Sequence, residues 1–256
     1  MYEIFAMKLG DREVDGSTIF YQSAPGIKVL KSFYFFCLKS EAHTILLDTG
    51  ISPEEMAVRE IAPRRSRQEL LASIDVRPEN IEAIILTHLH SDHFSGTEMY
   101  PHAIFYLQRL EFHFWSEEMG KFRHLLYPLF AKGRPIADIE TLHKLNGQNR
   151  VRFLDGDSDI LPGVRGLWCG AHTPGSQMVL VQTHQGPVLC CSDFFDCMRN
   201  WADRVPPGVL TSLPEWIEGI GKIERMRLPR ESIIPGHDLH LMTSFPVVAE
   251  DVVKIA

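Results

Sequence analysis

The feature that most constrains the fold of this chain is a cluster of metal-ligating side chains directly after a buried strand. Residues 81–86 form a continuous apolar run, which predicts a strand covered on both faces. Residues 87–93 then read Thr-His-Leu-His-Ser-Asp-His, so the candidate ligands are His88, His90, Asp92 and His93. Alternation directs the first two imidazoles to one side of an extended segment, while Asp92 and His93 lie at a tight turn and reach a second position. The spacing therefore predicts two adjacent metal ions.

Three more candidate ligands follow later strands. These are His172 in Gly-Ala-His-Thr-Pro-Gly, Asp193 in Cys-Cys-Ser-Asp and His237 in Ile-Pro-Gly-His-Asp. Taken singly, each could orient a turn, cap a helix or be exposed to solvent. Strand ends are nevertheless where α/β active sites are assembled, so we expect all three beside the first cluster. The five cysteines are scattered and never form C-x-x-C, which argues against a thiolate zinc site and a disulfide framework.

Hydrophobic periodicity predicts an α/β chain in which strands and helices recur in both halves. Strands are predicted at 4–9, 18–22, 32–38, 44–47, 81–86, 103–107, 151–154, 164–169, 178–183, 187–192 and 232–234, and helices at 53–61, 66–74, 109–130, 136–145, 213–226 and 247–255. No short repeat or Gly/Ser/Pro-rich linker divides the sequence. We therefore expect a single domain over residues 1–256, a sandwich with layers α/β/β/α, and a helical, aromatic-rich insertion at about 109–147.

Charge and apolar patterning restrict the partners. The chain has 26 basic and 33 acidic residues, a formal charge of −7, which argues against a nucleic-acid partner. No apolar run approaches the roughly 18 residues needed to span a bilayer, and the N-terminus lacks the pattern of an export signal. We expect a cytoplasmic protein that acts on a small molecule and does not bind a membrane.

The order of the candidate ligands resembles the metallo-β-lactamase superfamily. The resemblance implies the four-layer αβ/βα sandwich of that fold, with one metal held by His88, His90 and His172. A second metal would be held by Asp92, His93 and His237, and Asp193 would bridge both. Asp48, in Leu-Leu-Asp-Thr-Gly, matches a group that orients a metal-bound imidazole. Zn²⁺ is the expected metal, although Mn²⁺, Fe²⁺ or Co²⁺ also suits these ligands.

Within the superfamily, Thr-His-Leu-His-Ser-Asp-His-Phe-Ser-Gly at 87–96 resembles the N-acyl-homoserine lactonases. Only nineteen residues follow His237, so we expect no glutathione-binding extension of the glyoxalase II type. The presence of Asp193 and the lack of an export signal argue against a β-lactamase, and no basic arm suggests a tRNA nuclease. His90 stands where the flavodiiron proteins carry glutamate.

The resemblance implies that a metal-bridging hydroxide opens a lactone or a similar small acyl ester. Alternatives are a thioesterase or amidase on another acyl substrate, or a phosphodiesterase or nuclease using the same hydroxide. A metal-stabilised binding protein is disfavoured because every expected ligand is in place.

The candidate catalytic residues are Asp92, Asp193 and Asp196. Asp92 or Asp193 could accept a proton and pass it to the leaving oxygen. Asp196 stands where quorum-quenching lactonases carry a tyrosine that assists at the substrate carbonyl. A carboxylate donates no hydrogen bond unless protonated, so Asp196 could instead accept one from substrate, shuttle a proton, or be a solvated loop residue.

Aromatic side chains near the predicted site could line an acyl pocket. The candidates are Trp115, Phe122, Tyr127, Phe195 and Trp201. The alternative is that they pack against the sandwich or form a contact in a homodimer.

Overall fold

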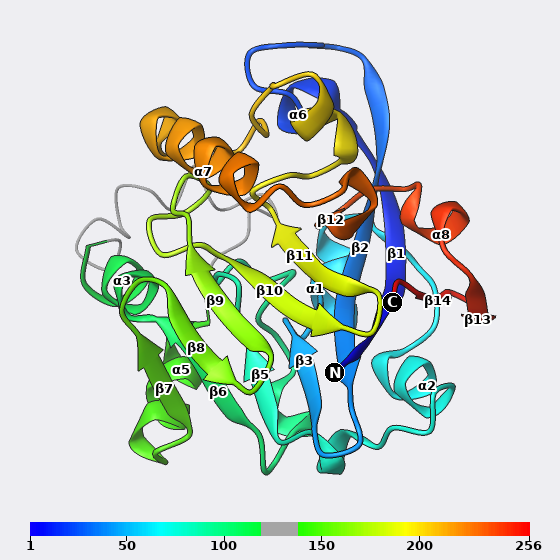
Figure 1. The fold of residues 1–256 in the computed structure, drawn as a ribbon, viewed down its shortest axis with the longest axis vertical. Coiled ribbons are helices and arrows are strands. Elements are labelled where there is room, and N and C mark those ends of the chain that lie inside the picture. The colour runs from blue at the N-terminus through cyan, green and yellow to red at the C-terminus, as the bar shows by residue number, and fades with distance from the viewer. Residues whose placement is uncertain (119–137) are drawn as a thin grey trace.

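The computed structural model describes residues 1–118 and 138–256 and contains two facing β-sheets with helices on their outer faces (Figure 1). The larger sheet has the order β13-β14-β1-β2-β3-β5-β6-β7, and β4 pairs with β1. Its strands are β1 (Glu3–Asp15), β2 (Lys28–Lys39), β3 (Thr44–Leu47), β4 (Ala62–Pro63), β5 (Ala83–Ile85), β6 (Ile104–Gln108), β7 (Val151–Leu154), β13 (Val247–Ala249) and β14 (Val252–Lys254). Strands β3, β5, β6 and β7 run parallel, so their carboxyl ends share one edge.

The smaller sheet has the order β12-β11-β10-β9-β8. Its strands are β8 (Ser158–Leu161), β9 (Val164–Trp168), β10 (Gln177–Thr183), β11 (Gly186–Ser192) and β12 (Ile233–Pro235). The pair β11 and β12 is parallel and the others are antiparallel. The described α-helices are α1 (Pro53–Val58), α2 (Arg67–Ala72), α3 (Arg109–His113), α5 (Ile139–Gly147), α6 (Met198–Ala202), α7 (Leu213–Met226) and α8 (Leu241–Ser244).

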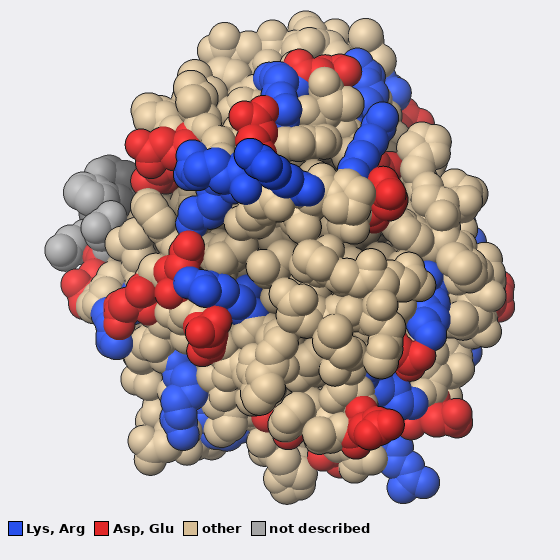
Figure 2. Space-filling model, in the orientation of Figure 1, with Lys and Arg blue, Asp and Glu red and all other residues tan. Residues whose placement is uncertain are grey.

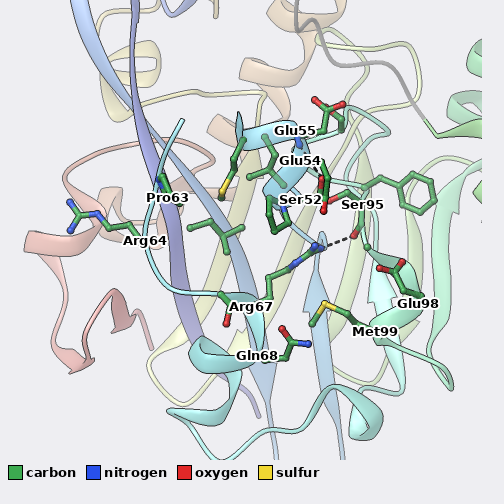
Figure 3. Close-up of a pocket in the computed structure, with 18 of the residues that line it drawn as sticks. Ser52, Glu54, Glu55, Pro63, Arg64, Arg67, Gln68, Ser95, Glu98 and Met99 are labelled. Atoms are coloured by element: carbon green, nitrogen blue, oxygen red, sulfur yellow. Dashed lines mark hydrogen bonds between the residues drawn. The ribbon is translucent and has the colours of Figure 1, made fainter. Parts of the chain in front are cut away.

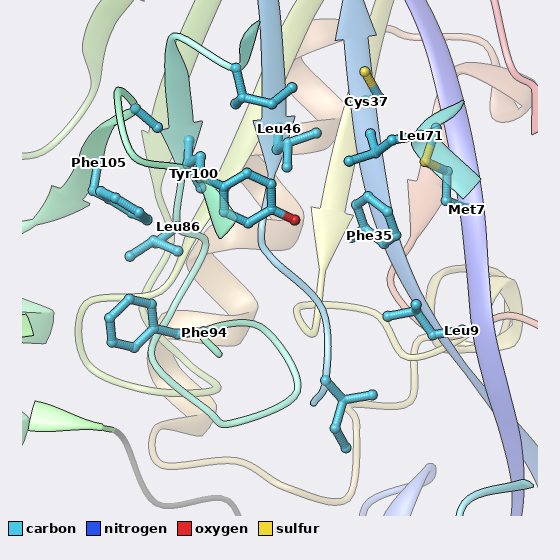
Figure 4. Packing of buried hydrophobic residues seen from close by; sticks show 14 of the residues in the cluster. Met7, Leu9, Phe35, Cys37, Leu46, Leu71, Leu86, Phe94, Tyr100 and Phe105 are labelled. Atoms are coloured by element: carbon cyan, nitrogen blue, oxygen red, sulfur yellow. The ribbon is translucent and has the colours of Figure 1, made fainter. Parts of the chain in front are cut away.

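Three hydrophobic clusters separate the layers. One lies between α1, α2, α5 and the larger sheet, and includes Leu46, Leu71 and Phe105 (Figure 4). The second lies between the two sheets, and the third packs the smaller sheet against Trp216 and Ile220 of α7. The expected α/β/β/α sandwich is therefore confirmed.

Strand β2 shows why the larger sheet lies in the interior. Phe33, Phe35 and Cys37 pack into the helix-side cluster, whereas the alternate residues Tyr34 and Phe36 pack into the cluster between the sheets. A strand with large apolar side chains on both faces can be covered only by a layer on each side. The same strand carries Lys31 and Ser32 toward the functional site described below.

Two predicted elements are wrong. Residues 18–22 form no strand, because the Asp15 carboxylate accepts hydrogen bonds from the amides of Ser17 and Gly26 and begins a short 3₁₀ turn, η1 (Gly16–Thr18). Residues 247–255 form the hairpin β13–β14 and not a helix, with Asp251 at φ +60° in the turn and β14 pairing with β1. The β-branched valines suit this edge pairing better than a helix.

Other boundaries differ more modestly. Strand β8 was not predicted, and β1 extends well beyond 4–9. Within the predicted insertion at 109–147, α3, a π-helical turn (Phe114–Glu118) and α5 are described, and residues 119–137 lie outside the described part of the chain. None of the described helices is long and apolar enough to cross a membrane.

Candidate metal centre

The predicted ligands meet where strands of both sheets end. His88, His90, Asp92 and His93 follow β5, Asp193 follows β11, and His237 follows β12. His172 lies in the loop between β9 and β10. All seven side chains are buried, so the chain brings five imidazoles and two carboxylates from four loops into one enclosed volume.

The first group of ligand atoms belongs to His88, His90 and His172 and lies within 4.8 Å. The Nδ1 atom of His90 is 3.0 Å from Nε2 of His88 and 2.8 Å from Nε2 of His172. Three imidazole nitrogens converging in this way suit a cation that accepts their lone pairs.

The second group contains Asp92, His93 and His237 and also lies within 4.8 Å. Asp193 stands between the groups: its Oδ1 atom is 3.0 Å from Nε2 of both His93 and His237, and its Oδ2 atom is 3.5 Å from Nε2 of His172. This is the position expected of a carboxylate shared by two cations.

The outer nitrogens of four imidazoles are already engaged. Nδ1–H of His172 donates to the carbonyl of Val209 (2.8 Å), and Nδ1–H of His237 donates to the carbonyl of Ser32 (2.7 Å). Nδ1 of His93 pairs with Asp48, and Nδ1 of His88 with the hydroxyl of Thr87. With Nδ1 protonated, each Nε2 directs a lone pair inward, which is the tautomer a metal requires.

Three inward atoms lack any hydrogen-bond partner among the described residues. These are Nε2 of His93, Nε2 of His237 and Oδ1 of Asp193, all buried. Buried polar atoms without partners are rare and costly, and these are N and O donors in a set suited to divalent cations. The residues therefore fit the metal pair that the sequence predicts.

At most positions the surroundings favour the protonation state that a metal ligand needs, which is a neutral imidazole or an ionised carboxylate. Burial lowers the pKa of His88 and His90 well below the usual value, and neighbouring imidazoles lower it further. Burial opposes ionisation of Asp193, but His237, His93 and Lys31 outweigh it and hold its pKa well below the usual range. For His93, Asp193 and Asp48 overcome burial and raise the pKa, so a cation would displace a proton there.

Asp48 supports the centre as the sequence suggested. Its carboxylate accepts hydrogen bonds from the amide of Thr87 (2.7 Å) and the hydroxyl of Thr87 (2.8 Å), and it pairs with Nδ1 of His93 (2.8 Å). Asp48 has φ +60°, a left-handed conformation in which Asp and Asn are tolerated. One side chain thus fixes both the strand end before the cluster and an imidazole within it.

The sequence analysis did not identify two basic side chains that lie at the centre. Arg59, just after α1, contacts Asp92 and lies over the ring of Phe33, 5.1 Å from its centroid. Lys31 of β2 places Nζ 2.8 Å from Asp196 and 3.8 Å from Asp193. Both contact partners far along the chain, so no local pattern could have revealed them.

Asp196 is part of this site and is not a solvated loop residue. Its side chain is buried and accepts a hydrogen bond from Lys31, and its carbonyl accepts one from the amide of His237. Asp196 therefore positions both the Lys31 ammonium and the candidate ligand His237.

Glu111 of α3 is a further residue that sequence reasoning missed. Its buried carboxylate accepts hydrogen bonds from the amides of Leu89 and Gly175, the hydroxyl of Thr173 and the indole of Trp115, at 2.8 to 3.0 Å. It therefore ties the loop carrying His88 and His90 to the loop carrying His172.

The predicted aromatic candidates are distributed unevenly. Trp115 packs against His90, with ring centroids 5.7 Å apart. Phe195 and Trp201 contact each other within the cluster under α7. Phe122 and Tyr127 lie outside the described residues.

A cavity of about 520 Å³ leads to the centre. The lining comes from β1, β2 and η1, from Arg59, from four of the candidate ligands and from the loop before α7. Its residues are Arg12, Val14, Ser17, Thr18, Lys31, Phe33, Arg59, His90, Asp92, His172, Asp193, Gly208, Val209 and Leu210. A small substrate would therefore reach the ligands between the β1–β2 hairpin and residues 208–210.

A second cavity of about 600 Å³ is lined by α1, α2 and the turn after the histidine cluster (Figure 3). Arg67 crosses it and donates to the carbonyls of Thr49 and Ser95. The described lining contains none of the seven candidate ligands. Arg67 links α2 to the turn after the histidine cluster.

Comparison with known proteins agrees with this geometry. Residues 31–237 match the family model of the metallo-beta-lactamase superfamily. The chain is 24% identical over 220 residues to an N-acyl homoserine lactonase of Bacillus cereus, covering 80% of each. It is 24% identical over 181 residues to the N-acyl homoserine lactonase AttM of Rhizobium radiobacter, covering 68% of this chain and 64% of that protein.

Solved structures share the fold. An N-acyl homoserine lactone hydrolase with N-hexanoyl-L-homoserine at its catalytic metal centre superposes with a TM-score of 0.72, at 21% identity and 96% coverage of both chains. AidC, a dizinc quorum-quenching lactonase, has a TM-score of 0.67 at 15% identity, covering 92% of this chain and 87% of that one. The family match spans most of the chain, including all seven candidate ligands, and the protein belongs to the metallo-beta-lactamase superfamily.

Proposed function

We propose that this protein is a metal-dependent hydrolase with a dinuclear centre that opens a lactone or a similar small acyl ester. The observation that carries the proposal is the convergence of seven buried ligand side chains, three with partnerless inward atoms. The lactonase names of the relatives and of the structural neighbours support the choice of a lactone.

His88, His90 and His172 would hold one ion, and Asp92, His93 and His237 the other, with Asp193 shared. Zn²⁺ is the proposed metal, with Mn²⁺, Fe²⁺ and Co²⁺ as alternatives. When bound, the two ions would supply a hydroxide nucleophile near neutral pH and polarise the substrate carbonyl.

The protein's own residues would position the reaction. Asp48 and the carbonyls of Ser32 and Val209 fix the imidazoles, which limits reorganisation during catalysis. Asp92 and Asp193 are the proposed proton acceptors. Lys31 lines the cavity, so its ammonium can donate a hydrogen bond to a substrate oxygen there, and Asp196 orients it. The pair Lys31–Asp196 would thus provide the donor that Asp196 alone cannot.

Thioesters and amides remain the nearest alternative substrates, because the same chemistry cleaves them. A nucleic acid is disfavoured: on the face shown in Figure 2, Lys and Arg are interspersed with Asp and Glu, and the chain carries a net charge of −7. The five free cysteines suit a reducing compartment, which supports a cytoplasmic location as part of this proposal.

The proposal is tested by metal content and by substrate range. Protein purified without chelator should contain close to two equivalents of metal by mass spectrometry. It should release acid from lactones faster than from thioesters, β-lactams or bis-p-nitrophenyl phosphate. His172→Ala should lose metal and activity together, whereas His184→Ala, in an exposed turn, should keep both. Turnover of the phosphodiester alone, or a folded protein that binds no added Zn²⁺ or Mn²⁺, would contradict it.

A further inference from the structure

Two basic side chains lie directly opposite each other at the cavity. Arg12 of β1 is the cross-strand partner of Lys31 of β2, and both line the cavity. Directly opposed residues project from the same face of an antiparallel pair, with Cβ atoms roughly 5 Å apart. Like charges in this position repel and destabilise the pair unless anions compensate them.

Among the described residues, only one of the two cations has an anionic partner. Lys31 is paired with Asp196. The side chain of Arg12 makes no hydrogen bond or ion pair with any residue in 1–118 or 138–256. Two nearby acidic residues of β1 are engaged elsewhere: Asp11 pairs with Lys8 and Arg64, and Asp15 accepts from Ser17 and Gly26. Glu13 is adjacent to Arg12 in the strand, so it projects from the opposite face.

The side chains that line the cavity also carry a more positive charge than the chain as a whole. Three cations line it, Arg12, Lys31 and Arg59, against two carboxylates, Asp92 and Asp193, in a chain whose net charge is −7. Both carboxylates are candidate metal ligands, so bound divalent ions would neutralise them. The potential in the cavity would then be positive, and a cleft of this kind concentrates anions.

We propose that Arg12 binds a carboxylate carried by the substrate, so that the enzyme prefers anionic lactones or esters to neutral ones. This inference rests on the proposed hydrolase function. A guanidinium pairs with a carboxylate through two parallel hydrogen bonds, and one unpaired guanidinium balances one negative charge. Val14 and Leu210 in the same cavity offer apolar contacts to the carbon skeleton between the carboxylate and the scissile bond.

The test compares two lactones that match closely in size and differ in the charge of one substituent. One is a γ-butyrolactone with a carboxylate on the carbon next to the ring oxygen, and the other is its primary carboxamide. Metal-loaded wild-type protein should show a higher kcat/KM for the carboxylate. Arg12→Gln should lower kcat/KM for the carboxylate about tenfold, mainly through KM, and leave the carboxamide unchanged. Arg12→Lys, which keeps the charge but loses the planar fork, should fall between them.

The matched control is Lys28→Gln, which removes a cation from the same hairpin at a position opposite Asp15 and outside the described cavity lining. It should keep the preference for the carboxylate. Added salt should reduce kcat/KM for the carboxylate lactone more than for the carboxamide. Equal kcat/KM for the two lactones in wild-type protein, or an unchanged preference in Arg12→Gln, would overturn the inference.

A binding measurement separates this inference from the proposed function. Calorimetry with the corresponding saturated ring ether, as its carboxylate and as its carboxamide, needs no turnover. If the carboxylate ether binds more tightly than the carboxamide and this preference is lost in Arg12→Gln, the anion site is supported. If neither lactone is hydrolysed in the same experiments, the proposed lactone hydrolysis alone is refuted. Equal binding of the two ethers would reject the anion site whether or not the lactones are cleaved.

Discussion

Arg59 contacts Asp92 through both ends of its guanidinium, with Nη1 3.1 Å from Oδ1 and Nη2 3.3 Å from Oδ2. Both side chains are buried, and Asp92 also belongs to the second group of candidate ligands. Asp92 is therefore neutralised from one side by an arginine, and its other side faces His93 and His237. This pairing lets the carboxylate stay ionised in the interior before any cation is bound.

Arg59→Met should consequently destabilise metal-free protein more than metal-loaded protein. Removing one partner of a buried ion pair costs about 3 to 5 kcal/mol, and a bound cation would compensate part of that loss. Urea denaturation of both forms measures the difference. Arg165→Met, which removes an exposed cation near Asp159, should have no such metal-dependent effect. Equal destabilisation with and without metal would show that Arg59 does not substitute for a cation at Asp92.

Asp48→Asn should weaken metal binding by about 10- to 100-fold, because the amide cannot accept all the hydrogen bonds that Asp48 receives from Thr87 and His93. Asparagine tolerates the left-handed backbone, so the fold should persist. Competition with a chelator of known affinity measures the change. Asp75→Asn is the matched control, since Asp75 also has positive φ (+59°) and is exposed. Unchanged affinity in Asp48→Asn would remove the orienting role.

Asp193→Asn should lower the bound metal from two equivalents toward one or none and abolish turnover. The amide keeps the size of the side chain but loses the charge that faces His93, His172 and His237. Metal analysis and activity on the same sample check the result. Chelation of wild-type protein should lower its melting temperature more than chelation of this variant. A fully metallated, active Asp193→Asn would refute the shared-ligand role.

Glu111→Gln should lower the free energy of unfolding by about 2 kcal/mol, because the amide nitrogen cannot accept bonds from buried donors that the carboxylate now satisfies. Metal affinity should fall with it, since both ligand loops depend on Glu111. Thermal and urea denaturation check the first effect. Glu117→Gln, one turn and a half further along and exposed, is the control. Stability equal to wild type would show that the four bonds are replaceable.

Asp11 should give the fold an acid-sensitive component of stability. Burial alone raises the pKa of Asp11, but Lys8, Ser32 and Arg64 outweigh it and hold the pKa below the ordinary 3.8. A carboxyl with a lowered folded pKa stabilises the protein above its unfolded pKa and loses this contribution as pH falls through the folded value. The stability difference between wild type and Asp11→Asn should be constant from neutral pH to about 5 and shrink below that. A stability difference that grows as the pH falls would contradict the lowered pKa of Asp11. Asp203→Asn, which changes an exposed carboxylate, serves as the control.

Local patterns were sufficient to find the strand before the cluster and the seven side chains that the fold brings together, because imidazole and carboxylate types at strand ends are visible in the sequence. They failed at 18–22, where the capping carboxylate of Asp15 outweighs β-propensity. They failed again at 247–255, where the β-branched valines suit a hairpin better than a helix and β14 pairs with β1. Lys31, Arg59 and Glu111 escaped prediction because their partners lie far along the chain, and only the folded topology brings them together.

The ligand side chains are divided between the two halves of the chain, with the first four before residue 94 and the last about 150 residues beyond His88. The first four follow a strand of the larger sheet, and His172, Asp193 and His237 follow strands of the smaller one. Neither sheet alone carries a complete set for both ions. A truncated chain that lacks β11 and β12 would keep His88, His90 and His172 but would lose Asp193 and His237. The second ion and the shared carboxylate therefore depend on the last strands of the smaller sheet.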